Sequence, residues 1–150
     1  MLSISPAAPG DADVLAMCAE LTAWTSRIYP DDEADASPHL PPRADVHFVV
    51  ARRDDEAVAC CGVQEYGPGV HELKRMFVRP EARGHGTARA ILAAAEELAR
   101  ARGAHTLLLE TGERLTAAVG LYTSAGFVRV PNYPPYEDAP LSLCFAKPLA

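Results

Sequence analysis

The chain has 150 residues, with 14 basic and 20 acidic side chains and a formal net charge of −6. This length fits a single domain that spans residues 1–150. The acidic balance argues against a nucleic-acid partner, because attraction to phosphates needs a basic face. No apolar run reaches the roughly 18 residues of a membrane span, and the first residues lack the basic and apolar segments of a signal peptide. We therefore expect a soluble, cytoplasmic protein without a membrane partner.

The first half of the chain predicts a strand, a helix and three further strands. Residues 1–5 alternate weakly, and Asp11 is suited to cap a helix that runs to about Arg27. The apolar positions of this helix at helical spacing are Val14, Leu15, Cys18, Leu21 and Thr22. Residues 29–45 are polar and rich in proline, which indicates a loop with room for one short helical turn. An antiparallel meander follows, with strands over 46–52, 57–66 and 70–78.

The second half changes from strand periodicity to helix periodicity. A helix is predicted from the glycine-containing loop at 79–86 to about Arg102. A buried type of strand follows over 105–111, and the chain then continues with a helix over 114–124 and strands over 127–130 and 141–147. A strand, a crossover helix and a second strand form a right-handed unit with parallel strands. We therefore expect strand 70–78 to run parallel to strand 105–111.

The four cysteines point to packing. Cys18, Cys60, Cys61 and Cys144 show no C-x-x-C spacing and lie in apolar periodic segments, where a free cysteine behaves as a small hydrophobic residue. We expect four reduced structural thiols and no metal site. The abundance of arginine and alanine is typical of a GC-rich bacterial genome.

The loop between strand 70–78 and the next helix has the composition of an anion site. Its sequence over 83–88 is RGHGTA. The first amides of a helix have no intrahelical partner, and the helix dipole is positive there. Small residues let a pyrophosphate approach these amides, and Arg83 adds positive charge. The P-loop and the dinucleotide-binding fingerprint are both absent.

Two short motifs lie in order within residues 70–130. Arg83, Gly86 and Ala88 match Arg/Gln-x-x-Gly-x-Gly/Ala, and residues 118–122 (AVGLY) followed by Gly126-Phe127 match A-x-x-L-Y…G-F. In both motifs the chain resembles the GNAT superfamily of acetyl-CoA-dependent N-acetyltransferases. The resemblance implies a mixed α/β fold with a twisted sheet of about seven strands and about four helices. It also implies that the fourth and fifth strands splay apart at a bulge.

The same resemblance implies how the co-substrate, acetyl-CoA, would bind. Its acetyl-pantetheine arm would enter between the splayed strands and pair with the backbone of Met76, Phe77 and Val78. Its pyrophosphate would lie on the amides of Arg83, Gly84, His85, Gly86, Thr87 and Ala88. A primary amine would attack the thioester directly, while a base takes its proton and a backbone N–H holds the oxyanion.

Tyr122 and Glu72 are the candidate catalytic residues. Tyr122 matches the family tyrosine that faces the CoA sulfur, where it would also contact the cofactor; the alternative is a buried core tyrosine. Glu72 lies six residues before Val78, where some members carry a glutamate base. Strand alternation places Glu72 on one face with Lys74 and Met76.

Several details of the catalytic assignment stay open. Glu110 and an ordered water are rivals of Glu72 for the role of base. Leu115 stands seven residues before Tyr122, where many family members have Asn, which puts one side-chain contact to the pantetheine arm in doubt.

The loop over 131–138 is the candidate acceptor site. By analogy with the family it lies near the acceptor end of the cleft. Two aromatic rings, Tyr133 and Tyr136, stand beside Glu137 and Asp138 and could receive an ammonium group by cation–π and Coulomb attraction. A stiff, solvated hairpin connection is the alternative.

Three functions are compatible with the sequence. The favoured one is acetylation of a small-molecule amine, the second is acetylation of a protein N-terminus or lysine, and the third is a non-catalytic acyl-CoA-binding sensor. The identity of the amine, the length of the acyl group and the oligomeric state do not follow from the sequence, and a homodimer is compatible with it.

Overall fold

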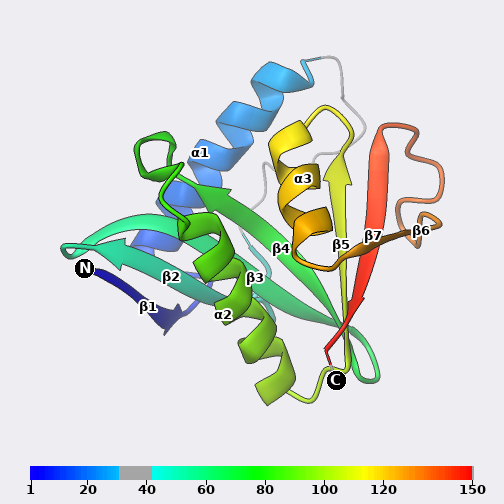
Figure 1. Cartoon of the computed structure of the whole chain (residues 1–150), viewed down its shortest axis with the longest axis horizontal. Helices are drawn as coiled ribbons and strands as arrows, with labels where there is room; N and C mark the ends of the chain where they lie inside the picture. The colour runs from blue at the N-terminus through cyan, green and yellow to red at the C-terminus, as the bar shows by residue number, and fades with distance from the viewer. Residues whose placement is uncertain (31–41, 150) are drawn as a thin grey trace.

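A computed structural model describes residues 1–30 and 42–149, which form a mixed α/β fold around one seven-stranded sheet (Figure 1). The strand order is β1-β2-β3-β4-β5-β7-β6. The strands are β1 (Leu2–Ala7), β2 (His47–Arg53), β3 (Glu56–Gly67), β4 (Val70–Val78), β5 (Thr106–Gly112), β6 (Val128–Val130) and β7 (Ser142–Pro148). The expected fold class and strand number are thereby confirmed.

The described residues contain three α-helices where about four helices were expected. They are α1 (Ala12–Ile28), α2 (Thr87–Ala101) and α3 (Thr116–Ser124), together with the short 3₁₀ helix η2 (Pro80–Ala82). Most of the predicted loop, 31–41, lies outside the described residues. None of the described helices is long and apolar enough to cross a membrane.

Helix α1 begins where the capping residue predicts. The Asp11 carboxylate accepts hydrogen bonds from the amides of Asp13 and Val14, at 2.9 and 3.3 Å. The buried side of the helix differs from the predicted stripe, because Leu15 is 41% exposed whereas Met17 is fully buried. Val14, Met17, Cys18 and Leu21 follow the i, i+3, i+4, i+7 spacing of one helix face, and this face packs on the sheet.

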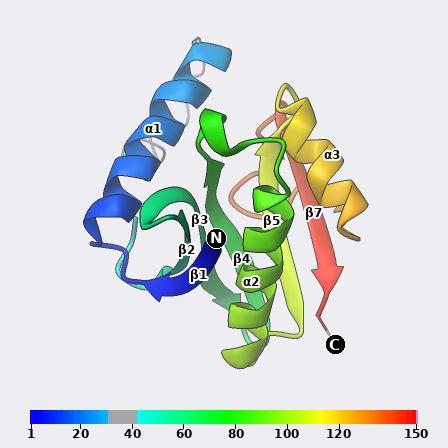
Figure 2. The same ribbon diagram turned by 60° about the vertical axis from the view of Figure 1, so that its left-hand side comes forward.

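The helices divide between the two faces of the sheet (Figure 2). Helix α1 packs on one face with Phe48, Cys60 and Phe77. Helices α2 and α3 cover the other face, where their apolar side chains pack with those of β3 and β5. All four cysteines are free and buried, as expected for packing residues.

Strand β4 contains a bulge at Arg75. Cys60 of β3 pairs with Phe77 of β4, and Gly62 pairs with Lys74. A step of two residues along β3 therefore lies opposite a step of three residues along β4. Arg75 has φ +53°, a left-handed conformation that is unfavourable for a residue with a Cβ. The extra residue reverses the alternation of side chains. Met76 therefore packs on the α2 side, and the expectation that it shares a face with Glu72 and Lys74 was wrong.

Strands β4 and β5 pair over a short distance and then separate. Their parallel ladder joins Val70–Glu72 to Thr106–Leu108. Beyond it, β4 stays with β3 and β5 stays with β7, so the two strands diverge toward their carboxyl ends (Figure 1). This confirms the predicted splay. Glu72 is the last residue of β4 in this ladder, which places it at the apex of the opening.

Candidate active site

The loop before α2 has the geometry of an anion-binding helix N-terminus. Gly84 and Gly86 have φ values of +82° and +77°, the left-handed region that favours glycine. Gly86 is the N-cap of α2, and no side chain caps this end. A Cβ at either glycine would meet no atom within 4 Å, so the loop is open on this side. The arrangement suits a pyrophosphate bound by backbone amides.

Arg83 is fixed between the loop, β4 and α1. Its Nε donates to the carbonyl of Val78 at 3.0 Å, and its guanidinium carbon lies 5.2 Å from the ring centre of Trp24. Thr87 is buried, and its hydroxyl accepts a 3.4 Å hydrogen bond from Arg53. The side chain of His85 is exposed. The loop therefore offers mainly backbone donors, with the Arg83 charge held beside them.

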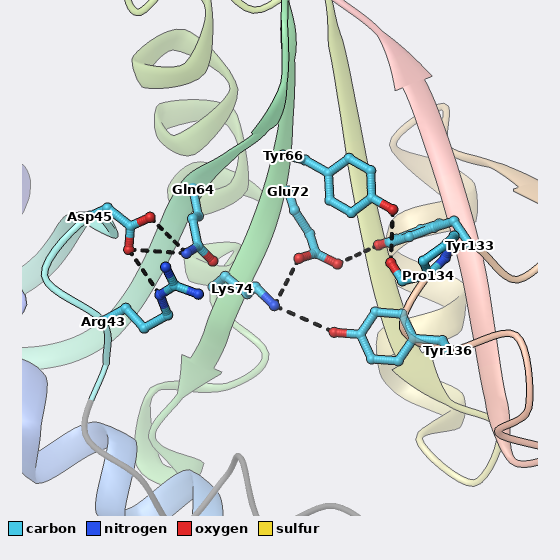
Figure 3. A network of polar contacts seen from close by, with 9 residues as sticks. All are labelled: Arg43, Asp45, Gln64, Tyr66, Glu72, Lys74, Tyr133, Pro134 and Tyr136. Carbon is cyan, nitrogen blue, oxygen red and sulfur yellow. Dashed lines mark hydrogen bonds and ion pairs between the residues drawn. The ribbon is translucent and has the colours of Figure 1, made fainter.

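Glu72 is buried and bonded through both carboxylate oxygens (Figure 3). Tyr133 donates its hydroxyl to Oε2 at 2.6 Å, and Lys74 Nζ lies 2.7 Å from Oε1. Lys74 Nζ also lies 3.4 Å from the hydroxyl of Tyr136. The predicted base and the two predicted acceptor-site tyrosines therefore meet in one network, which the structure brings together from β4 and the β6–β7 connection.

The β6–β7 connection is folded against β3 and β4. Tyr133 makes edge-to-face contacts with Tyr66 and Tyr136, at centroid distances of 5.2 and 5.5 Å. The hydroxyl of Tyr66 donates to the carbonyl of Pro134 at 2.8 Å. The amide of Asn132 donates to the carbonyls of Tyr136 and Ala139 in the same connection and to that of Ser142 at the start of β7, at 3.1 to 3.3 Å. The three tyrosines therefore form an aromatic wall beside the Glu72 carboxylate.

Burial and the neighbouring Glu72 carboxylate raise the pKa of Tyr133 well above its ordinary value. The hydroxyl thus keeps its proton and remains a donor at neutral pH. Because the bond runs to a carboxylate, it belongs to the stronger, charge-assisted class. It holds Glu72 in one orientation at the apex of the splay.

Tyr122 lies on α3, which covers the other face of the sheet. Its side chain is 5% exposed and makes an edge-to-face contact with Phe127 at 5.8 Å. Burial raises the pKa of Tyr122, with smaller contributions from Cys61 and Glu110. The phenol is therefore neutral at physiological pH.

Glu110, the rival base, lies on β5 and accepts a 2.6 Å hydrogen bond from the hydroxyl of Ser142. Burial raises the pKa of the Cys144 thiol, and the charges of Glu110 and Glu72 add to this effect. The two carboxylates therefore lie near the same thiol. Leu115 is the N-cap of α3 and provides no side-chain hydrogen bond there.

Sequence reasoning did not assign Lys74 or Tyr66 to the site. The two-residue spacing from Glu72 could have identified Lys74, since alternate strand residues share a face. Nothing near Tyr66 in the sequence indicates its role, because its partners lie in the β6–β7 connection.

Comparisons with known proteins identify the family to which this fold belongs. The sequence profile of the Acetyltransferase (GNAT) family matches residues 15–127. A protein of Azospirillum brasilense named IAA acetyltransferase is 36% identical, over 99% of this chain and 98% of its own length.

Solved structures show the same fold. A Klebsiella pneumoniae protein assigned to the acyl-CoA N-acyltransferases has a TM-score of 0.85 and 36% identity, with coverage of 100% of this chain and 99% of its own. A GNAT family acetyltransferase of Elizabethkingia anophelis, solved with acetyl-CoA bound, has a TM-score of 0.70 and 14% identity over 98% of this chain and 97% of its own. At this low identity the second likeness concerns the fold alone.

Proposed function

Because the chain belongs to the GNAT acetyltransferase family, we propose that it transfers an acetyl group from acetyl-CoA to the primary amine of a small molecule. The observation that carries this proposal is the position of Glu72. A buried carboxylate, bonded to the candidate acceptor loop, stands where the pairing of β4 with β5 ends. The opening beyond it would receive the thioester, and the loop would receive the amine.

In this proposal, backbone groups hold most of the co-substrate. The amides of Gly84, Gly86 and the first turn of α2 bind the pyrophosphate, which the open surface at both glycines supports. Met76, Phe77 and Val78 offer the pantetheine arm the edge of β4 that β5 does not pair with. The carbonyl of Val78 already accepts from Arg83, and a carbonyl oxygen can accept a second hydrogen bond.

Glu72 and Tyr122 divide the proton transfers. Glu72 takes a proton from the acceptor ammonium, which frees the nitrogen lone pair for attack on the thioester carbon. The carbon–sulfur bond then breaks as Tyr122 donates its proton to the leaving sulfur. The nitrogen gives up its second proton to solvent, from which the phenol is reprotonated. Burial raises the pKa of Tyr122, so the phenol carries its proton at neutral pH, as an acid must before it donates.

The choice of a small-molecule acceptor is supported by a relative that matches nearly the whole chain. Its name, IAA acetyltransferase, supports a small-molecule acceptor over a protein acceptor. The polar network around Glu72 supports an enzyme over a sensor, because a sensor needs no buried base beside its ligand.

The test is CoA release, measured with a thiol reagent over a panel of small amines and peptides, with mass spectrometry of the products. Release with a small amine and an acetylated product supports the proposal. Release with peptides alone favours the protein acetyltransferase, and acetyl-CoA binding without release favours the sensor.

A further inference from the structure

Lys74 gives the candidate acceptor site a positive charge that the proposed proton transfers do not use. Its Nζ pairs with Glu72 Oε1 at 2.7 Å. The Glu72 side chain is 7% exposed, whereas that of Lys74 is 28% exposed. The carboxylate is therefore shielded from solvent, whereas the Lys74 ammonium is partly accessible and can be reached by an acceptor.

An acceptor amine that approaches Glu72 has to share the carboxylate with Lys74, because Tyr133 occupies the other oxygen. Two cations bound to one carboxylate lie a few ångströms apart and repel each other. An acceptor with its own carboxylate avoids this repulsion, since its carboxylate pairs with Lys74 while its ammonium pairs with Glu72.

The neighbouring charged residue Arg43 is less suited than Lys74 to bind the carboxylate of an acceptor. On the same side of the sheet, Gln64 lies directly opposite Glu72 in the β3–β4 ladder and donates to Asp45 at 3.0 Å. Arg43 pairs with the same Asp45 at 3.3 Å (Figure 3). The Arg43 side chain is 78% exposed, so solvent weakens its attraction to a substrate carboxylate more than it does at Lys74.

Building on the function proposed above, we infer that Lys74 determines acceptor specificity by binding the carboxylate of an amino acid. The aromatic wall of Tyr66, Tyr133 and Tyr136 adds a preference for a large apolar or aromatic side chain. Tyr66 is 43% exposed, so this wall is accessible from solvent. The acceptor class is therefore aromatic and large aliphatic amino acids with a free α-amino group.

The experiment compares acceptors that differ only in the carboxylate. The pairs are phenylalanine and phenethylamine, tyrosine and tyramine, and tryptophan and tryptamine, assayed by CoA release. We expect kcat/KM to be at least tenfold higher for the amino acid of the preferred pair. Lys74→Met should raise the KM of the amino acid about tenfold or more and leave the KM of its partner amine unchanged or lower. Lys74→Arg should restore part of the loss, because it keeps the charge.

A matched control is Arg102→Met, which removes an exposed positive charge at the C-terminal end of α2, on the other face of the sheet from Lys74, and should change neither KM. Equal or better turnover of the decarboxylated amines overturns the inference alone. The same holds if Lys74→Met impairs both members of a pair equally, since Lys74 would then only orient Glu72. Absence of CoA release from every amine, amino acid and peptide overturns the proposed function and this inference with it.

Discussion

Tyr133 donates a 2.6 Å hydrogen bond to the carboxylate of Glu72, although the two residues lie 61 positions apart. The bond ties the β6–β7 connection to the apex of the β4–β5 splay. It joins a residue expected to recognise the acceptor to one expected to take its proton. In the proposed mechanism, acceptor binding and proton transfer are therefore coupled through one contact, and this coupling can be tested by substitution.

The first prediction concerns the acetyl-CoA loop. Gly86→Asp should lower acetyl-CoA affinity at least tenfold, or about 1.4 kcal/mol, because a carboxylate would stand where the pyrophosphate binds. Calorimetric titration measures the affinity. Gly103→Asp is the matched control, since Gly103 also has a positive φ and open space but lies at the opposite end of α2. Equal affinities in the two folded variants would contradict the site assignment.

The second prediction concerns Tyr122 as the acid. Tyr122→Phe should keep acetyl-CoA affinity and lower kcat by roughly 10²-fold, the low end for lost general acid catalysis. Burial raises the pKa of Tyr122 above the ordinary value of about 10. Its deprotonation therefore causes no loss of activity below pH 10. If kcat falls with rising pH in that range, the same fall should be seen in the variant. If Tyr122→Phe keeps the wild-type kcat, Tyr122 is not the acid and has only a packing role.

The third prediction concerns Glu72 as the base. Glu72→Gln should lower kcat/KM by roughly 10²-fold or more. Glu110→Gln is the matched control on β5. If kcat/KM falls in Glu110→Gln and not in Glu72→Gln, the base is Glu110.

The fourth prediction concerns the acceptor loop. Tyr133→Phe removes only the hydroxyl that bonds Glu72, and a hydrogen bond to a charged group contributes about 1.5–3 kcal/mol. We expect kcat/KM for the amine to fall roughly 10- to 100-fold, with acetyl-CoA affinity unchanged. Tyr136→Phe, which removes the hydroxyl that lies 3.4 Å from Lys74, should have a smaller effect. The loop has no acceptor role if Tyr133→Ala and Tyr136→Ala both keep the wild-type amine KM.

Much of the fold could be predicted from local patterns. Asp11 predicted the start of α1, and the family motifs predicted the splay of β4 and β5. The face of Met76 could not be predicted, because it depends on a bulge at Arg75 that no glycine marks in the sequence. A single extra residue reverses every side chain beyond it.

The site was predictable in its parts but not in its connections. Glu72, Tyr133 and Tyr136 were each candidates from the sequence, and their functional roles stay predictions. Their shared network, with Lys74 as the second partner of Glu72, depends on how the β6–β7 connection folds back onto β3 and β4. Such contacts between distant segments leave no local sequence pattern.

The central claim is that acetyl-CoA occupies the opening between β4 and β5, with its pyrophosphate on the loop before α2. Titration of the ¹⁵N-labelled protein with acetyl-CoA, followed through backbone amide resonances, tests it most directly. The account predicts the largest shifts at Met76–Val78 and at residues 83–88, with Gly103 unmoved. Shifts confined to other segments, or none at millimolar acetyl-CoA, would contradict it.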